Sequence, residues 1–218
     1  RSLAETAFIT PDKDALKSQF ATFLATNLDW YNTSYTNNPK PDNTLGAIFD
    51  LYSTEYNDKR GIAPWMDDFF TSAAGRAAEL GYTQALPLLK WKAKFPISRM
   101  NDPSYCWILG AIYSMNVRDT ATSSYYTTIG QAYLASSPAT LTSLACNSPA
   151  MAANLGLKVG EMTGYAYGTE GFPSNMQPAL AYSVDSGVAG GADAWKIFMS
   201  RSVKPDYSTN PEFAVIPR

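Results

Sequence analysis

The chain has 218 residues, of which 45% are hydrophobic, enough for one substantial core, and its net charge of −2 without a basic cluster argues against a nucleic-acid surface. No stretch approaches the roughly 20 apolar residues that a membrane-spanning helix needs. The absence of histidine excludes Ser-His-Asp and Cys-His catalysis and histidine-based zinc sites, so we expect no metal and no cofactor, and any catalysis would use Asp, Glu, Tyr, Lys or Arg.

Helix signals begin close to the N-terminus. Thr10, Pro11 and Asp12 are typical of an N-cap, a first helical proline and an acid in the first turn. Apolar residues then recur at helical spacing to about residue 32. They are Leu16, Phe20, Phe23, Leu24, Leu28 and Tyr31. A loop is expected over residues 39–44, and residues 45–56 are predicted as a weaker helix.

The clearest helix boundaries come next. The predicted helices cover residues 64–80, 84–95 and 104–115. Pro64 begins the first of them and Gly81 closes it as a C-terminal cap. Thr83 caps the second helix, and the pair Asp102-Pro103 opens the third.

The C-terminal half is predicted as shorter helices with glycine-rich connections. The helices cover residues 123–134, 148–155, 177–185 and 192–201. Residues 159–175 contain four glycines and no helical period, which is typical of a long loop or a small hairpin. Residues 203–218 contain three prolines and are expected to extend over the surface. We therefore predict one helical domain, 1–202, followed by an extended tail, 203–218.

Two stretches share the layout of a helical hairpin. In residues 77–91 and 182–198, a helix ends at an acid, one residue and a glycine, and a short loop leads to a helix with a tryptophan. Hairpins with short turns give antiparallel helix pairs. The sequence therefore predicts an all-α fold of antiparallel helical hairpins, arranged as a helical bundle or a partial (α/α) toroid.

Three aromatic-rich segments carry a resemblance to a known architecture. They are APWMDDFF at residues 63–70, DPSYCWI at residues 102–108 and GYAYGTEGFPS at residues 164–174. With the successive hairpins, they look like part of the (α/α) toroid of six-hairpin glycoside hydrolases and polysaccharide lyases. The resemblance implies a domain that binds or cleaves a polysaccharide or oligosaccharide. A complete ring needs more helices than this chain supplies, so a partner domain or subunit would complete it.

Three carboxylates are the candidates for glycosidic bond cleavage. Asp67 and Asp68 lie in or next to the first turn after Pro64, where the helix dipole favours a carboxylate, so a structural role is one interpretation. In the other interpretation, one of them faces a groove beside Trp65. Adjacent helical residues point about 100° apart, so the two cannot form a facing pair. Glu170, on a glycine-flanked loop, is the candidate second acid that glycoside hydrolysis needs, with a solvent-facing turn as its alternative.

The candidate substrate-binding residues are aromatic or cationic. They are Trp65, Arg99, Tyr105, Tyr165 and Tyr167. Flat amphipathic rings suit sugar faces, although local packing explains the two loop tyrosines equally well. Arg99 either pairs with Asp102 at the mouth of the next helix or clamps an acidic sugar. Trp107 is the expected core anchor of that helix.

Cys106 and Cys146 either form a disulfide in an exported protein or remain two separate buried thiols. The Lys-poor surface rich in Thr, Tyr and Asn favours a secreted or periplasmic protein. The alternative to a carbohydrate-active domain is a non-catalytic structural or interaction module, part of a larger extracellular protein or assembly. A surface or filament subunit is a third interpretation.

Overall fold

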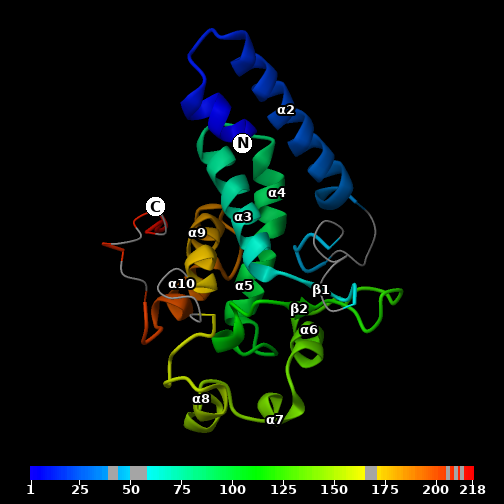
Figure 1. Cartoon of the computed structure of the whole chain (residues 1–218), viewed down its shortest axis with the longest axis vertical. Coiled ribbons are helices and arrows are strands. Elements are labelled where there is room, and N and C mark those ends of the chain that lie inside the picture. The colour runs from blue at the N-terminus through cyan, green and yellow to red at the C-terminus, as the bar shows by residue number, and fades with distance from the viewer. Residues whose placement is uncertain (39–43, 50–57, 165–170, 205–206, 209–210, 212–213) are drawn as a thin grey trace.

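The computed structural model describes the chain except for residues 39–43, 50–57, 165–170, 205–206, 209–210 and 212–213. The described part consists of helices and one very short pair of strands (Figure 1), which confirms the all-α prediction. The helices are α1 (Ser2–Ala4), α2 (Ala15–Tyr31), α3 (Pro64–Glu79), α4 (Ala85–Lys92), α5 (Lys94–Asn101), α6 (Ile129–Ser136), α7 (Ala139–Thr142), α8 (Pro149–Leu155), α9 (Phe172–Asp185) and α10 (Gly191–Met199). Between them lie the π-helical turns η1 (Glu5–Ile9) and η2 (Asn32–Thr36), the 3₁₀ turn η3 (Trp107–Leu109) and the strands β1 (Gly61–Ile62) and β2 (Met115–Asn116). Within these described elements, no helix combines the length and the apolar character that crossing a membrane requires.

Two helical hairpins form the centre of the fold. In the turn between α3 and α4, Gly81 adopts a φ of 93°, and the Tyr82 N–H donates to the Ala77 carbonyl over 3.0 Å. In the turn between α9 and α10, Gly187 and Gly190 adopt φ values of 71° and 83°. Positive φ favours glycine, so both turns form where the sequence supplies it.

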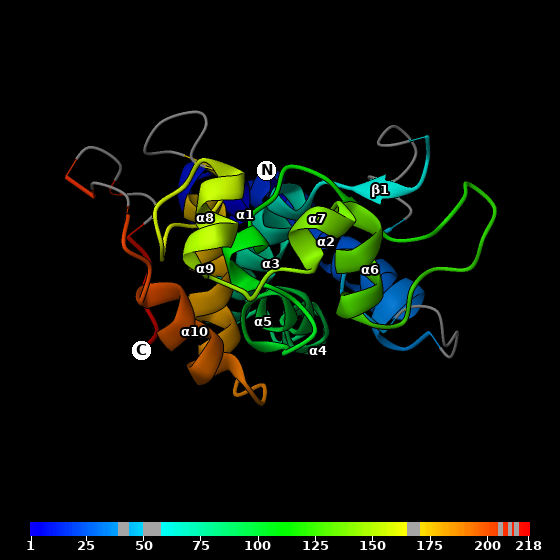
Figure 2. The same cartoon turned by 90° about the horizontal axis from the view of Figure 1, so that it is seen from below.

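The hairpins pack side by side through α3 and α9, and α5 packs against both α9 and α10 (Figures 1 and 2). Gly75 permits the close approach of α3 to α9, because a Cβ atom at this position would lie 2.2 Å from Tyr182 Cγ. We call α3, α4, α5, α9 and α10 the hairpin block. α2 lies diagonally against one end of this block and buries Leu24 and Leu28 there.

α2 begins later than the pattern at Thr10 predicts. Its N-cap is Asp14, whose Oδ1 accepts from the Leu16 N–H over 2.8 Å. The Thr10 hydroxyl donates instead to a carboxylate oxygen of Glu5 over 2.9 Å, at the end of η1. Lys13 has a φ of 69°, which is incompatible with a helix running through it. Asp14, and not Thr10, therefore caps α2.

The predicted weaker helix over residues 45–56 is wrong for the residues that the structure describes. Residues 45–49 are not helical, and Gly46 has a φ of 79°. The Ile48 N–H donates to Asp67 Oδ1 over 3.1 Å, so a buried side chain takes the place of a helical acceptor. Residues 50–56 of this prediction lie outside the described part.

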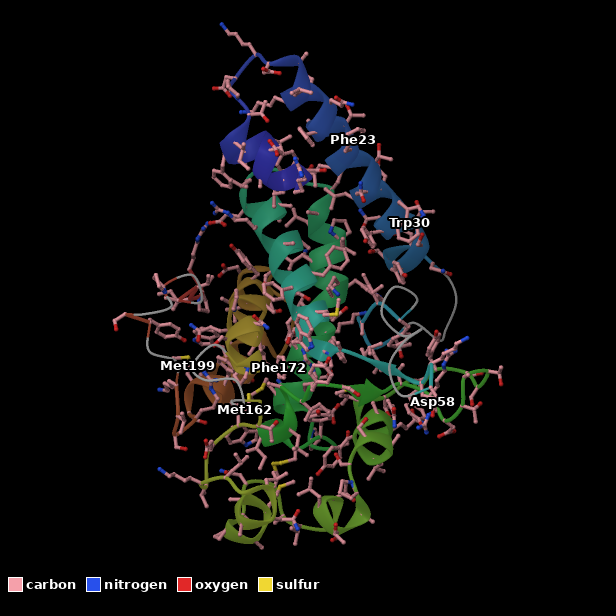
Figure 3. The ribbon with its side chains drawn as sticks, viewed as in Figure 1. Phe23, Trp30, Asp58, Met162, Phe172 and Met199 are labelled. Atoms are coloured by element: carbon pink, nitrogen blue, oxygen red, sulfur yellow. A yellow bond between two sulfur atoms is a disulfide. The ribbon has the colours of Figure 1, made fainter. Side chains whose placement is uncertain are left out.

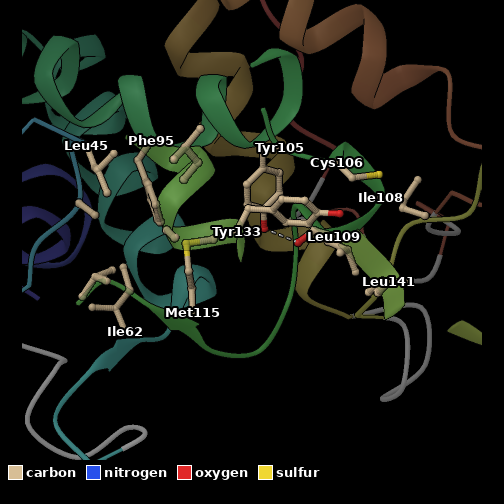
Figure 4. Close-up of a cluster of buried hydrophobic side chains, with 14 of the residues drawn as sticks. Leu45, Ile62, Phe95, Tyr105, Cys106, Ile108, Leu109, Met115, Tyr133 and Leu141 are labelled. Carbon is tan, nitrogen blue, oxygen red and sulfur yellow. Dashed lines mark hydrogen bonds between the residues drawn. The ribbon is translucent and has the colours of Figure 1, made fainter. Parts of the chain in front are cut away.

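Residues 102–163 form a second region, which occupies the lower part of Figure 1 and is seen from below in Figure 2. Cys106 and Cys146 form a disulfide, with Cα atoms 5.3 Å apart, which decides between the two interpretations of these cysteines. We call residues 102–163 the disulfide region. Its helices α6, α7 and α8 are short, and its core includes Tyr105, Met115 and Tyr133 (Figure 4).

The predicted helix over residues 104–115 is wrong, because only η3 is helical there. The Asp102 side chain accepts from the Ser104 N–H over 2.9 Å and makes a tight turn instead of a helix start. The Gly110 carbonyl accepts from the Arg99 guanidinium over 2.7 Å, which removes an acceptor that a helix would use. Trp107, the expected core anchor, is half-buried against two core clusters.

Two expectations concern the C-terminal side. α9 begins at Phe172, so the end of the predicted loop 159–175 is helical. Residues 214–218 of the predicted tail belong to no helix or strand, and the extended course of the tail stays a prediction.

Candidate functional site

Asp67 and Asp68 are buried in ion pairs and not exposed at a groove. Asp67 is 0% exposed, and its Oδ1 accepts from Lys92 Nζ over 2.7 Å. Asp68 is 1% exposed and is paired with the Arg99 guanidinium. Pro64 begins α3 as predicted, which places both acids near its first turn. Neither carboxylate reaches the surface in this conformation, so neither contacts a polymer bound there.

The cations of these pairs connect three parts of the chain. Lys92 lies at the end of α4, with its ammonium 4.9 Å from the centre of the Phe70 ring. Arg99 on α5 stacks on Phe95 at 4.3 Å and also donates to the Gly110 carbonyl. Arg99 therefore joins α3 to the disulfide region, and the predicted pairing of Arg99 with Asp102 is wrong.

Burial dominates the electrostatics of the two pairs. It raises the pKa of Asp68 from 3.8 to about 6, with the Arg99 charge acting in the opposite direction. Burial also lowers the pKa of Lys92, against the charge of Asp67. Burying two ion pairs carries a large desolvation cost, and removing one partner would leave a buried charge uncompensated. The geometry thus assigns both acids to the architecture of α3.

A row of four aromatic rings lies beside the start of α3, and we call it the aromatic strip. It consists of Phe69, Trp65, Phe172 and Tyr113. The ring centroids are 6.4 Å apart for Phe69 and Trp65, 5.8 Å for Trp65 and Phe172, and 5.5 Å for Phe172 and Tyr113. Phe69 and Tyr113 are 52% and 50% exposed, so both ends of the strip face solvent. Figure 3 marks Phe172 near the centre of the molecule.

Local structure brings the strip together from three elements. Trp65 and Phe69 lie on one face of α3 because they are four residues apart. Phe172 is the first residue of α9, and Tyr113 lies between η3 and β2. The Phe172 N–H donates to the Gly164 carbonyl over 3.1 Å. Gly164 and Gly171 therefore both lie next to the strip.

Some of the candidate site residues lie in the described part of the chain and others do not. Tyr165, Tyr167 and Glu170 lie outside the described residues, although the chain on either side of them borders the strip. Trp65 belongs to the strip, and its role as a groove residue stays a prediction.

Three buried polar atoms on α3 lack a hydrogen-bond partner among the described residues: the Trp65 indole nitrogen, Asp67 Oδ2 and Asp68 Oδ2. Trp65 and Asp68 are three positions apart, so their side chains are neighbours on the helix. Buried polar groups are normally hydrogen-bonded.

Tyr105 lies in the core of the disulfide region and not in the aromatic strip. It packs on Tyr133 with ring centroids 5.1 Å apart, and its hydroxyl donates to the Leu109 carbonyl over 2.8 Å (Figure 4). Burial raises its pKa. It lines a groove of about 670 Å³, together with the disulfide and Gln131. Because Tyr105 is almost fully buried, little of it is accessible from this groove.

Sequence reasoning missed three rings of the strip and one buried cation. The spacing of Phe69 from Trp65 was an available signal, since residues four apart share a helical face. Tyr113 was hidden inside a predicted helix that does not form. Lys92 alternates with Lys90 and Lys94, and nothing in this pattern marks the central lysine as buried.

Comparisons with protein-family models, with curated proteins and with solved structures gave no match. In the part of the chain that the structure describes, no group of three or more Cys, Asp or Glu residues is placed to hold a metal ion.

Proposed function

We propose that this chain binds a carbohydrate polymer along the aromatic strip. The observation that carries the proposal is the unbroken series of ring contacts from Phe69 to Tyr113, with both terminal rings half exposed. Aromatic rings offer large apolar faces at a low cost in conformational entropy, which suits the flat C–H faces of sugar rings.

The proposal concerns binding and not cleavage by the acids of α3. Asp67 and Asp68 are engaged by Lys92 and Arg99 away from solvent, whereas glycoside hydrolysis needs two carboxyl groups on either side of the scissile bond. Glu170 remains a candidate for an acid beside the strip because of its position in the sequence.

Two broader expectations belong to the same proposal. The Cys106–Cys146 disulfide supports a secreted or periplasmic protein, because disulfides persist in oxidising compartments. The neighbouring hairpins α3–α4 and α9–α10 support a partial (α/α) toroid, which a partner domain or subunit would complete.

Glycan-array binding of the purified chain, followed by calorimetric titration with the best glycan, tests the proposal. We expect Phe69→Ala and Tyr113→Ala each to weaken binding by about 1 kcal/mol, or roughly fivefold. Phe23→Ala is the matched control, because Phe23 is 45% exposed on α2 and does not belong to the strip. A chain that retains no glycan, or strip variants that bind as well as the control, would overturn the proposal.

A second function, docking of a partner domain, is favoured by the outer face of α2. Leu16, Phe23 and Trp30 are each about half exposed and seven residues apart, so they form an apolar stripe along the helix. Figure 3 shows Phe23 and Trp30 along α2, the diagonal helix at the edge of the molecule. Exposed apolar stripes of this kind mark protein interfaces. Sedimentation equilibrium of the natural full-length protein and its Phe23→Ser variant would show whether the stripe supports assembly.

A further inference from the structure

The segment 214–218 belongs to no helix or strand and lies against α9, near the C-terminal end marked in Figure 1. Its residues alternate: Val215 and Pro217 are half-buried, whereas Ala214, Ile216 and Arg218 are exposed. An extended chain places successive side chains on opposite sides, so this alternation means that one side of the segment faces the helices.

A buried amide holds the backbone of this segment. The Gln177 side chain, on α9, is 1% exposed, and its Nε2 donates to the Val215 carbonyl over 3.2 Å. Val215 borders an apolar groove of about 380 Å³ between α3 and α9, which Phe69 and Pro178 also line. An amide committed to a main-chain carbonyl recognises a peptide backbone whatever its sequence.

Two acids hold the arginine at the other end. The Arg218 N–H donates to Asp185 Oδ1 over 2.9 Å, and its guanidinium is paired with the Glu79 carboxylate. Glu79 is itself fixed, because it accepts from the Tyr182 hydroxyl over 3.0 Å and from Arg76 over 2.5 Å. Arg218 lies at a hollow of about 360 Å³ that Glu79, Tyr182 and Asp185 also border. A carboxylate held in place in this way loses little entropy on pairing with an arginine.

We propose that the α3–α9 face is a peptide-binding site. It takes an extended segment with an apolar residue followed three positions later by an arginine, and residues 214–218 of the chain occupy it in cis. The site has three parts at fixed spacing: the apolar groove, the Gln177 amide and the acidic pair of Asp185 and Glu79. A peptide with the same features, presented by another molecule, competes with the chain's own segment for this face. The proposal does not depend on carbohydrate binding, because Phe69 is the only residue of the aromatic strip that borders the groove.

A fluorescent peptide with the sequence of residues 211–218, amidated at its C-terminus, tests this site by anisotropy on the full chain. The amide ensures that the arginine side chain, and not a terminal carboxylate, is measured. Arg218→Ala in the chain weakens the competing segment, so this variant is expected to bind the peptide about tenfold more tightly than the unchanged chain. Arg218→Ala in the peptide is expected to weaken binding about tenfold. The same substitution is thus expected to raise the affinity for the peptide when it is made in the chain, and to lower it when it is made in the peptide.

Further variants identify the acidic pair. Asp185→Asn and Glu79→Gln, introduced singly into the Arg218→Ala chain, are each expected to lower peptide affinity several-fold. Ile216→Ala in the peptide is the matched control and leaves affinity unchanged, because Ile216 is 65% exposed. The proposal is overturned if the Arg218→Ala chain fails to bind the peptide, or if binding is insensitive to both acid substitutions in variants whose circular dichroism is native.

Discussion

The hairpin block and the disulfide region are held together by different means. In the hairpin block, helices meet through close backbone approach at Gly75 and through the buried pairs of Asp67 with Lys92 and Asp68 with Arg99. In the disulfide region, the helices are short, and a covalent link between Cys106 and Cys146 ties the chain together. The first region is specified by side chains distant in sequence, and the second by local turns and a cross-link.

The comparison explains why the acids of APWMDDFF are buried. A helix packed on several sides has few exposed positions, and a charged side chain on a buried face is costly unless an opposite charge pairs with it. Lys92 and Arg99 supply these partners from α4 and α5 and thereby fix how the helices are placed relative to one another. The aromatic strip then forms where the free side of α3 meets the start of α9.

The largest expected effect comes from breaking a buried pair. Arg99→Met leaves Asp68 buried without a partner and is expected to lower the free energy of unfolding by about 3–5 kcal/mol, measured by urea denaturation. In this variant the pKa of folded Asp68 lies further above its unfolded value of 3.8. The folded state then binds the proton more tightly, so the loss is expected to be smaller at about pH 5 than at about pH 7.

Lys196→Met is the matched control for that experiment. Its partner Asp193 lies 3.7 Å away, and both side chains are exposed. The expected change is about 0.5 kcal/mol or less, because exposed pairs contribute little. Equal losses in the two variants would show that the Asp68–Arg99 pair is not buried in solution.

The next largest effect concerns the disulfide region. Replacing Cys106 and Cys146 together with serine removes a cross-link that spans 40 residues, and is expected to cost about 2–4 kcal/mol. Hydrogen exchange should rise first in α6, α7 and α8, and less in the hairpin block, because the latter does not depend on the link. An equal rise of hydrogen exchange in both regions would contradict the claim that only the disulfide region depends on the cross-link.

A smaller effect is expected from overpacking the close contact between α3 and α9. Gly75→Ala places a methyl group against the Tyr182 ring and is expected to cost about 1–3 kcal/mol by overpacking. Tyr182→Ala in the same chain should recover part of this loss, so the double variant is expected to be more stable than the sum of the single changes predicts. Additive losses would mean that the two helices do not meet at these residues.

The fold was predictable where a helix carries its own start and stop signals. Pro64 and Gly81 begin and close the first helix of the hairpin block as the sequence indicates, and Ser148 caps α8. The fold was not predictable where a side chain distant in sequence forms a hydrogen bond with the backbone. The Arg99 guanidinium donates to the Gly110 carbonyl, and Asp67 accepts from the Ile48 N–H. In both places a predicted helix is absent.

The candidate site was predictable only in part, for a related reason. Trp65 was identified from its position at the start of a helix, but its neighbours in the strip come from two other elements. Asp68 was ambiguous, because the dipole argument places a carboxylate at a helix start without saying whether it is exposed. The burial of Asp68 depends on Arg99, which lies 31 residues away along the chain.

The measurement that tests this account most directly is carbodiimide labelling of carboxylates in the native protein, with the modified sites located by mass spectrometry. We expect exposed acids such as Asp12 and Asp193 to be labelled rapidly, and Asp67 and Asp68 to be labelled only after denaturation. Native-state labelling of Asp67 or Asp68 at the rate of Asp193 would contradict the account, because it would show that this carboxylate faces solvent.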